Sequence, residues 1–459
     1  MTHSVLQFLG AVGTVTGSRF LLEQDSRSVL VDAGLYQGPK ELRERNWVAP
    51  SFDVAALDAV VLTHAHLDHC GYLPALYRAG FRGPIFATPG TIALANIVLP
   101  DAGRLQEEEA HHANKHGWSK HNPALALFTE QEAIDVGTLF QPVPFGQDYT
   151  VAEGLTLHLR TAGHILGAAS VTMTTAAGRR IVFSGDLGRS SHPLLLPPAQ
   201  RPDCDILLIE STYGDRTHTD DGLEPLAEVI RRTVERKGTV VIPAFAVDRT
   251  ELVIHAIRQL ERSGAIPVVP VIVDSPMALA ALAVYRQARE RHDSELRPEL
   301  FGTDDPFVTG SLTETPSVEE SKAATARADS TIVISASGMA SGGRVLHHLT
   351  KHLPDPRSSV VIAGFQAQGT RGRQLAEGAT EVKIHGAYVP VRAEVVAIDA
   401  FSGHADSDEL IAWADVHRTP PSTTFVIHGE TEASMALRTR LRNAAWTSVI
   451  PRFGERVVV

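Results

Sequence analysis

Cysteine is nearly absent from the sequence, which has only two, Cys70 and Cys204, among its 459 residues. Two cysteines this far apart exclude a disulfide framework, and the lack of a closely spaced pair excludes a zinc site built on thiolates. A chain without stabilising disulfides is typical of a reducing compartment, so the sequence predicts a cytoplasmic protein.

Long apolar runs are missing as well. None reaches the roughly 18 residues that a membrane-spanning helix requires. The opening stretch, MTHSVLQFLGAVGTVTG, has neither the basic start nor the apolar segment of a secretion signal. We therefore expect no association with a membrane.

Positive charge is scarce relative to negative charge. The chain has 42 Lys and Arg against 53 Asp and Glu, for a net charge of −11. This balance excludes a protein that coats nucleic acid without selectivity, although it leaves room for a local basic groove.

The length of the chain allows two or three domains, since a single core rarely grows beyond about 250–300 residues. Apolar runs of strand length alternate with segments of helical periodicity, and this alternation predicts an α/β fold. The helical segments are expected at 92–116, 222–236, 249–263 and 276–291.

Polar residues at the ends of the predicted strands are the most informative feature. Ligands in α/β sheets bind at the carboxyl ends of the strands, so side chains at these ends can converge. One such residue would need no special explanation, but seven His, Asp or Glu residues indicate a functional site. They are Asp32, His64, His164, Asp186, Glu210, His404 and His428.

The densest group of these side chains lies in VVLTHAHLDHCGYLP, residues 60–74. After the apolar strand, His64 and His66 can face one side together. Asp68 and His69 are expected on the turn that leads into the next helix. Two pairs of ligands therefore point at two neighbouring positions, and imidazole with carboxylate suits zinc.

Further ligands must come from other parts of the chain, because one hexapeptide cannot close two coordination spheres. His164, between glycines in TAGHILGAAS, and His428, in VIHGE, each follow a predicted strand. Asp186, in FSGDLG, has two oxygens with which to bridge two ions. Asp32 is better placed to orient a ligand through a hydrogen bond.

The order of these motifs resembles that of the metallo-β-lactamase superfamily: Asp32, HAHLDH, GHILG and SGD. Three later motifs resemble those of its β-CASP nucleases, a group that includes RNase J, Artemis and the cleavage-and-polyadenylation endonuclease subunit. They are Glu210 in ESTYGDRTH, His404 in FSGHAD and His428 in VIHGE. Four more stretches are similar to bacterial and archaeal relatives of the polyadenylation nuclease: LGAVGTVTGSRFLLE, VIPAFAVDRTEL, VDSPMA and SASGMASGGRVLHHL.

The resemblance implies an αββα metallo-β-lactamase sandwich interrupted by an inserted α/β domain. The expected limits are 1–205 for the first part of the sandwich, 206–394 for the β-CASP domain and 395–459 for the completion of the sandwich. This split would bring His428 to the same site as His64.

The resemblance also implies two zinc ions. One would bind His64, His66, His164 and Asp186, and the other Asp68, His69, Asp186 and His428. The catalytic residues would be Asp68, Asp186, Glu210 and His404. A hydroxide bridging the ions would attack the phosphodiester, while His404, oriented by Glu210, would protonate the leaving 3′ oxygen. A purely structural role for this pair, in which it ties two domains together, stays open.

A glycine- and serine-rich loop, SASGMASGGR at 335–344, is expected to cradle a phosphate with its backbone amides. A tight turn alone would also explain such a loop. Arg249 and Arg371 are weaker candidates for lining a substrate groove, and Asp248, where glycine is expected, leaves the orientation of Arg249 open. The residues expected at the phosphate are Ser337, Gly338, Gly342, Gly343 and Arg344.

These features together favour a zinc-dependent ribonuclease that cuts single-stranded RNA, as an endonuclease with some 5′ exonuclease activity. Three alternatives stay open: a small-molecule hydrolase of thioesterase or lactamase type, a DNA nuclease of the same group, and a non-catalytic RNA-binding subunit. The Glu210 and His404 motifs argue against the first, the His428 motif against the second, and the complete ligand set against the third. Resemblance alone suggests a homodimer.

Overall fold

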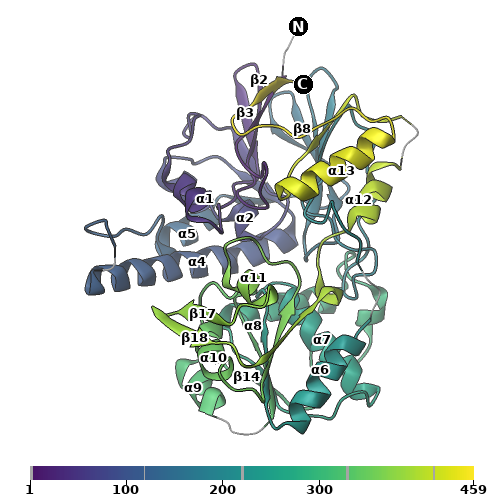
Figure 1. Ribbon diagram of the computed structural model, residues 1–459. Helices are drawn as coiled ribbons and strands as arrows, with labels where there is room; N and C mark the ends of the chain where they lie inside the picture. Colours follow the sequence, from purple (N-terminus) through teal and green to yellow (C-terminus); the bar gives the residue numbers. More distant parts are fainter. Residues whose placement is uncertain (1–3, 118, 219–221, 327–329, 417–418) are drawn as a thin grey trace. The chain divides into compact units, whose positions relative to one another are not determined.

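The chain divides into two compact units, each with its own sheets (Figure 1). The computed structural model describes residues 4–117, 119–218, 222–326, 330–416 and 419–459. The first unit comprises Met1–Thr217 and His404–Val459, and the second comprises His218–Gly403. The predicted α/β class is confirmed, and so is the insertion of one unit into the sequence of the other.

Two seven-stranded sheets form the frame of the first unit. One has the order β22 (Arg456–Val458), β1 (Ser4–Phe8), β2 (Phe20–Gln24), β3 (Arg27–Val31), β4 (Ala59–Val61), β5 (Ile85–Ala87) and β6 (Phe140–Pro142). The other has the order β21 (Ser448–Val449), β20 (Thr423–Val426), β11 (Ile206–Ile209), β10 (Arg180–Phe183), β9 (Ala169–Thr174), β8 (Leu155–Thr161) and β7 (Asp148–Ala152).

A single hydrophobic core joins these two sheets. The ring of Phe8 lies 4.8 Å from that of Phe425, and the ring of Phe20 lies 5.9 Å from that of Phe183. Burying each such side chain contributes about 1.5–3 kcal/mol, so the sandwich is a stable support for the loops at its edge. Its helices are α1 (Lys40–Glu44), α2 (Leu67–Cys70), α3 (Leu73–Arg78), α4 (Pro89–His116), α5 (Glu130–Gly137), α12 (Ser407–Ala414) and α13 (Thr431–Asn443).

The second unit is built on a six-stranded parallel sheet. Its order is β14 (Leu312–Glu314), β13 (Val271–Val273), β15 (Thr331–Ser335), β12 (Thr239–Pro243), β16 (Ser359–Ala363) and β19 (Glu394–Ile398). The helices are α6 (Glu224–Glu235), α7 (Arg249–Arg262), α8 (Pro276–Glu290), α9 (Val318–Ala326), α10 (Val345–His352) and α11 (Arg371–Ala376). A separate antiparallel hairpin consists of β17 (Glu381–Ile384) and β18 (Ala387–Pro390).

The observed division falls later than the predicted boundaries at both 206 and 394. Strand β11 stays in the first unit because it pairs in parallel with β10 on one side and β20 on the other. Strand β19 stays in the second unit because it pairs with β16. Within the described residues, no helix has both the length and the apolar character needed to cross a membrane.

Candidate metal centre

The loop after β4 carries the first four candidate ligands. His64 and His66 leave the strand, whereas Asp68 and His69 already lie in the one-turn helix α2, not on a turn as predicted. A Cβ atom on Gly34 would lie 1.6 Å from the Asp68 carbonyl oxygen, so only glycine allows the chain after β3 to approach α2 this closely. Helix α2 is thereby held at the end of the sheet.

His164 and Asp186 arrive on two loops of the opposite sheet. His164 follows β8, and Asp186 follows β10. A Cβ atom on Gly188 would lie 1.7 Å from the Gly163 carbonyl oxygen, so these two loops touch through their backbones. That contact brings the two side chains to one side of the sandwich, and both are buried.

Three histidines and one oxygen of Asp186 converge on a first position. The Nδ1 atom of His66 lies 3.2 Å from Nε2 of His64 and 3.2 Å from Nε2 of His164. The Oδ2 atom of Asp186 lies 3.5 Å from His64 Nε2 and 3.7 Å from His164 Nε2. These four residues are the set that the family resemblance implies for one zinc.

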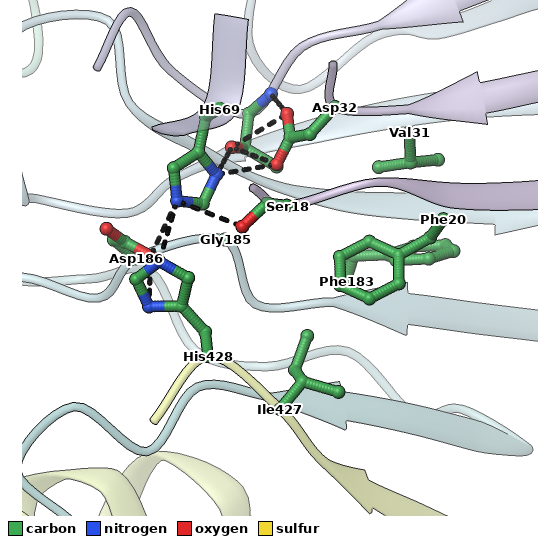
Figure 2. A pocket seen from close by; sticks show the side chains of 11 residues that line it. Ser18, Phe20, Val31, Asp32, His69, Phe183, Gly185, Asp186, Ile427 and His428 are labelled. Carbon is green, nitrogen blue, oxygen red and sulfur yellow. Dashed lines mark hydrogen bonds and ion pairs between the residues drawn. The ribbon is translucent and has the colours of Figure 1, made fainter. Parts of the chain in front are cut away.

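The other oxygen of Asp186 faces a second group (Figure 2). Its Oδ1 atom lies 3.3 Å from His69 Nε2, which is itself 3.1 Å from His428 Nε2. Asp68 Oδ2 lies 3.5 Å from the same nitrogen of His428. The two carboxylate oxygens of Asp186 therefore point at different ligand groups, as a bridging residue must.

These separations fit two tetrahedrally bound divalent ions. Zinc–nitrogen bonds of about 2.0–2.1 Å place neighbouring ligand atoms of a tetrahedron about 3.3 Å apart. The ring nitrogens face one another at 3.1–3.2 Å. Among the described residues, no group donates a hydrogen bond to the buried Oδ1 of Asp186. A bound cation would satisfy this oxygen and the facing nitrogens together.

Two histidines of the first group are held in the protonation state that binds a metal. Burial, with positive charge on His69, holds the pKa of His64 well below its ordinary value, and burial lowers the pKa of His66 to about 4. Both rings are therefore neutral at pH 7, the form that binds a metal. Burial alone would raise the pKa of Asp186, but electrostatic interaction with the surrounding histidines, His428 and His69 first, holds that pKa well below its ordinary value.

One hydroxyl and one carboxylate contact the candidate ligands from outside the two groups. Asp32 Oδ2 lies 2.7 Å from His69 Nδ1, and its role in orienting a ligand stays a prediction. Thr63, which sequence reasoning missed, donates to Asp32 Oδ2 at 2.9 Å and lies 3.0 Å from His64 Nδ1. A hydroxyl residue directly before the first histidine of HAHLDH was the available signal.

The loop after β11 holds two histidines from the distant end of the chain. The Nδ1 atom of His404 lies 3.4 Å from Glu210, whose Oε1 accepts a hydrogen bond of 2.6 Å from the Leu187 amide. Two residues later, Thr212 Oγ1 lies 3.3 Å from His428 Nδ1, a contact that the sequence did not predict. One short segment thus positions both rings.

His404 lies beside the ligand groups. Its ring is 4.5 Å from that of His164, and its Nδ1 atom is 3.9 Å from Asp186 Oδ2. Burial lowers the pKa of His404, but the nearby carboxylates, Glu210 first and then Asp186 and Asp68, together raise it, so the pKa ends above its ordinary value. The His404 ring can therefore carry a proton.

The residues expected to contact phosphate lie in the second unit, in the loop between β15 and α10. The guanidinium of Arg344 donates to Asp274 Oδ1 at 2.9 Å and to the carbonyl oxygens of Thr315 and Pro316. Asp274 is fully buried. A phosphate contact by this loop stays a prediction, and Arg344 has a structural role within its own unit.

Arg249 does not line a groove. Its side chain is buried and donates to the Ala363 carbonyl oxygen at 3.2 Å. The turn before it places Asp248 at a φ of +69°, the conformation for which glycine was expected, and Tyr285 donates a hydrogen bond to that carboxylate. The aspartate therefore completes the turn, and the arginine points inward.

Three family descriptions match successive parts of the chain. Residues 27–243 match the Beta-lactamase superfamily domain, residues 250–375 the Beta-Casp domain, and residues 388–451 the Zn-dependent metallo-hydrolase RNA specificity domain. Together these matches span both units and the ligand motifs.

Full-length similarity points the same way. The chain is 36% identical to Ribonuclease TTHA0252 of Thermus thermophilus, over 98% of this chain and 99% of that protein. It is 29% identical to Transcription termination factor FttA of Methanocaldococcus jannaschii, over 93% of this chain and 67% of that protein. A solved structure of a protein of unknown function from Enterococcus faecalis V583 covers 100% of both chains with a TM-score of 0.54 and 14% identity, which shows a shared fold alone.

Proposed function

The chain belongs to the β-CASP group of the metallo-β-lactamase superfamily and is a metal-dependent ribonuclease, and from this premise we propose that it binds two zinc ions and cuts single-stranded RNA internally. Some 5′ exonuclease activity is part of the same proposal. So are a homodimer, which rests on family resemblance, and a cytoplasmic location, which rests on the scarcity of cysteine.

One observation carries the proposal of two ions, namely the position of Asp186. Its Oδ2 faces His64 and His164, and its Oδ1 faces His69 and His428. When bound, two cations neutralise charge on the phosphoryl oxygens and lower the pKa of a water molecule. The chain contributes the geometry, because ligands fixed by hydrogen bonds and burial need little rearrangement when RNA binds.

His404 is proposed to donate the proton that the leaving 3′ oxygen needs. Glu210 contacts the Nδ1 edge of the His404 ring and favours the protonated form of that ring. A positioned proton donor of this kind accelerates a reaction by about 10²–10⁴-fold. Because Glu210 is itself held by the Leu187 amide, the acid and its orienting group form one rigid unit.

Elemental analysis tests the metal proposal. Protein purified without chelator should contain two zinc ions per chain, and chelation should abolish RNA cleavage until zinc is restored. Less than one zinc per chain, with none regained on adding metal, would contradict it.

A substrate comparison tests the activity. The purified protein should cut single-stranded RNA far faster than it hydrolyses a thioester, a lactam or single-stranded DNA of the same sequence. Product ends from a circular and a 5′-blocked RNA then separate internal cleavage from 5′ degradation, because only an endonuclease opens the circle. Efficient thioester hydrolysis with intact RNA would overturn the proposal.

A further inference from the structure

The hairpin of β17 and β18 presents two different faces. Val382, Ile384 and Val389 point inward and join a hydrophobic cluster of the second unit. The residues between them point outward, because successive side chains on a strand alternate. The apolar side chains of the hairpin are therefore already used, and its outer face is polar and aromatic.

The outer face carries a tyrosine paired with a lysine. Tyr388 and Lys383 are direct cross-strand partners, and the Lys383 ammonium lies 5.9 Å from the tyrosine ring centre. Tyr388 is 66% exposed, more than any other tyrosine described. A large exposed ring beside a cation is suited to stacking on a flat ligand that carries negative charge.

Contacts at the end of the hairpin join this face to the glycine-rich loop. The ring of His385, at the turn, stacks on that of His347 at 5.2 Å, and His347 lies in the first turn of α10, just after the loop. Arg371 donates to the carbonyl oxygen of Lys383 at 2.9 Å and also to that of Ala340, within the loop. One arginine thus ties the loop to the hairpin and adds positive charge between them.

We propose that the outer face of this hairpin is a binding surface for single-stranded RNA, with one base stacked on Tyr388 and phosphates drawn to Lys383 and Arg371. This inference rests on the ribonuclease function proposed above. Lys383 balances Glu381, the only acid among residues 381–390, and Arg371 beside them adds a further positive charge, in a chain of net charge −11. A protein partner would need an apolar patch, and the apolar residues of this hairpin face inward.

The main test compares cleavage of a long RNA and a trinucleotide by Tyr388→Ala. Loss of base stacking is worth about 1–3 kcal/mol, so the long-to-short ratio of kcat/KM should fall about tenfold, chiefly through KM for the long RNA. Tyr388→Phe keeps the ring and should behave as the wild type. Tyr149→Ala is the matched control, because Tyr149 is also an exposed tyrosine, on a strand of the other unit.

A second measurement uses salt and cross-linking. Lys383→Gln should reduce the slope of the logarithm of the RNA-binding constant against the logarithm of salt concentration by about one, as expected for one lost phosphate contact. Ultraviolet cross-linking of an RNA containing 4-thiouridine should label the peptide that includes Tyr388.

The outcomes separate this inference from the proposed function. If the wild type cuts RNA and Tyr388→Ala matches Tyr149→Ala at every RNA length, the hairpin is no RNA surface while the ribonuclease stands. If the wild type cuts no RNA, the proposed function fails, and cross-linking of the same intact protein still decides whether the hairpin binds RNA. Absence of cross-links at 381–390 would overturn the inference.

Discussion

Two buried carboxylates, one in each unit, are kept ionised by different surroundings. Asp186 in the first unit and Asp274 in the second are both buried, and both have a pKa held well below the ordinary value against the effect of burial. Asp274 is surrounded by donors. His348 and Ser321 lie 2.6 and 2.8 Å from its Oδ2, and Arg344 and Thr315 each lie 2.9 Å from its Oδ1.

Asp186 is surrounded by histidine nitrogens at 3.3–3.7 Å. Several of these nitrogens face one another, so they cannot all be satisfied by hydrogen bonds among themselves. The difference teaches how to tell a structural cluster from a functional one. A buried cluster with balanced donors and acceptors is complete, whereas a cluster with an excess of lone pairs requires a cation.

The largest effect should come from Asp186→Ala, which tests the functional side of this comparison. Both ligand groups lose a member, so the variant should lose both metals and fall to background RNA cleavage. Zinc content and cleavage rate, measured on the same preparation, check this. Near-normal hydrolysis would show that Asp186 is not shared between two ions.

His404→Ala tests whether His404 donates a proton or binds a metal. We expect both zinc ions to remain, because His404 lies beside the ligand groups, and the chemical step to slow by about 10²–10⁴-fold. An RNA with sulfur at the scissile 3′ position needs no proton on its leaving group, so wild type and variant should cut it almost equally. Glu210→Gln should show a milder form of this pattern. Loss of zinc, or no rescue by sulfur, would assign His404 a structural role.

Asp274→Asn tests the structural side. Removing the charge leaves Arg344 and His348 without their buried partner, and breaking such a pair costs about 3–5 kcal/mol. Urea unfolding should show this loss while zinc content stays at the wild-type level. Ser321→Ala, which removes one hydrogen bond from the same carboxylate, is the control and should cost only about 1 kcal/mol. A loss of zinc equal to that of Asp186→Ala would contradict the distinction between a structural cluster at Asp274 and a metal-binding one at Asp186.

Thr212→Val probes the support of one ligand. The hydroxyl lies 3.3 Å from Nδ1 of the His428 ring, and removing such support weakens metal affinity about 10–100-fold. Competition with a chelator should show one zinc released more easily and the other unchanged. Thr212→Ser keeps the hydroxyl and should restore the affinity. Equal weakening of both ions would point to general unfolding of the site.

The smallest effect is expected from Glu251→Gln, which offers a third kind of buried carboxyl. Within the described part of the chain neither of its oxygens has a hydrogen-bond partner, and burial raises its pKa well above the ordinary value. The contribution of the neutral Glu251 carboxyl to folding stability is therefore fully present below the pKa that this group has in the unfolded chain. It is lost as the pH rises through the higher pKa of the folded protein. Between these two pKa values, the free energy of unfolding of the variant should rise relative to that of the wild type by up to about 1.4 kcal/mol per pH unit. Urea unfolding at several pH values checks this, and a constant difference would contradict it.

Much of the candidate site could be predicted from the sequence because its residues stand at strand ends in a fixed order. His164 and Asp186 converge with HAHLDH as expected. Thr63 and Thr212 escaped prediction, because threonine is common near strand ends and its role depends on which way the hydroxyl turns. The inward direction of Arg249 depends on the Ala363 carbonyl, a contact between the start of α7 and the end of β16 that no local pattern encodes.

The fold was predictable where apolar runs were long and less so where strands were short. Strands β12 and β15 are buried throughout, so their sequences stand out. Strand β7 is largely exposed, and the hairpin of β17 and β18 alternates over only a few residues. The later unit boundary at β11 follows from its pairing with β20, which lies far along the chain.

The distance in sequence between His69 and His428, 359 residues, has a consequence for the synthesis of this protein. Ribosomes add about 5–20 residues per second, so roughly 20–70 seconds separate the appearance of these two side chains. During that interval the growing polypeptide has neither β20 nor the ligand that follows it. A chain assembled in this order therefore lacks one candidate ligand of the second group until residue 428 has been added.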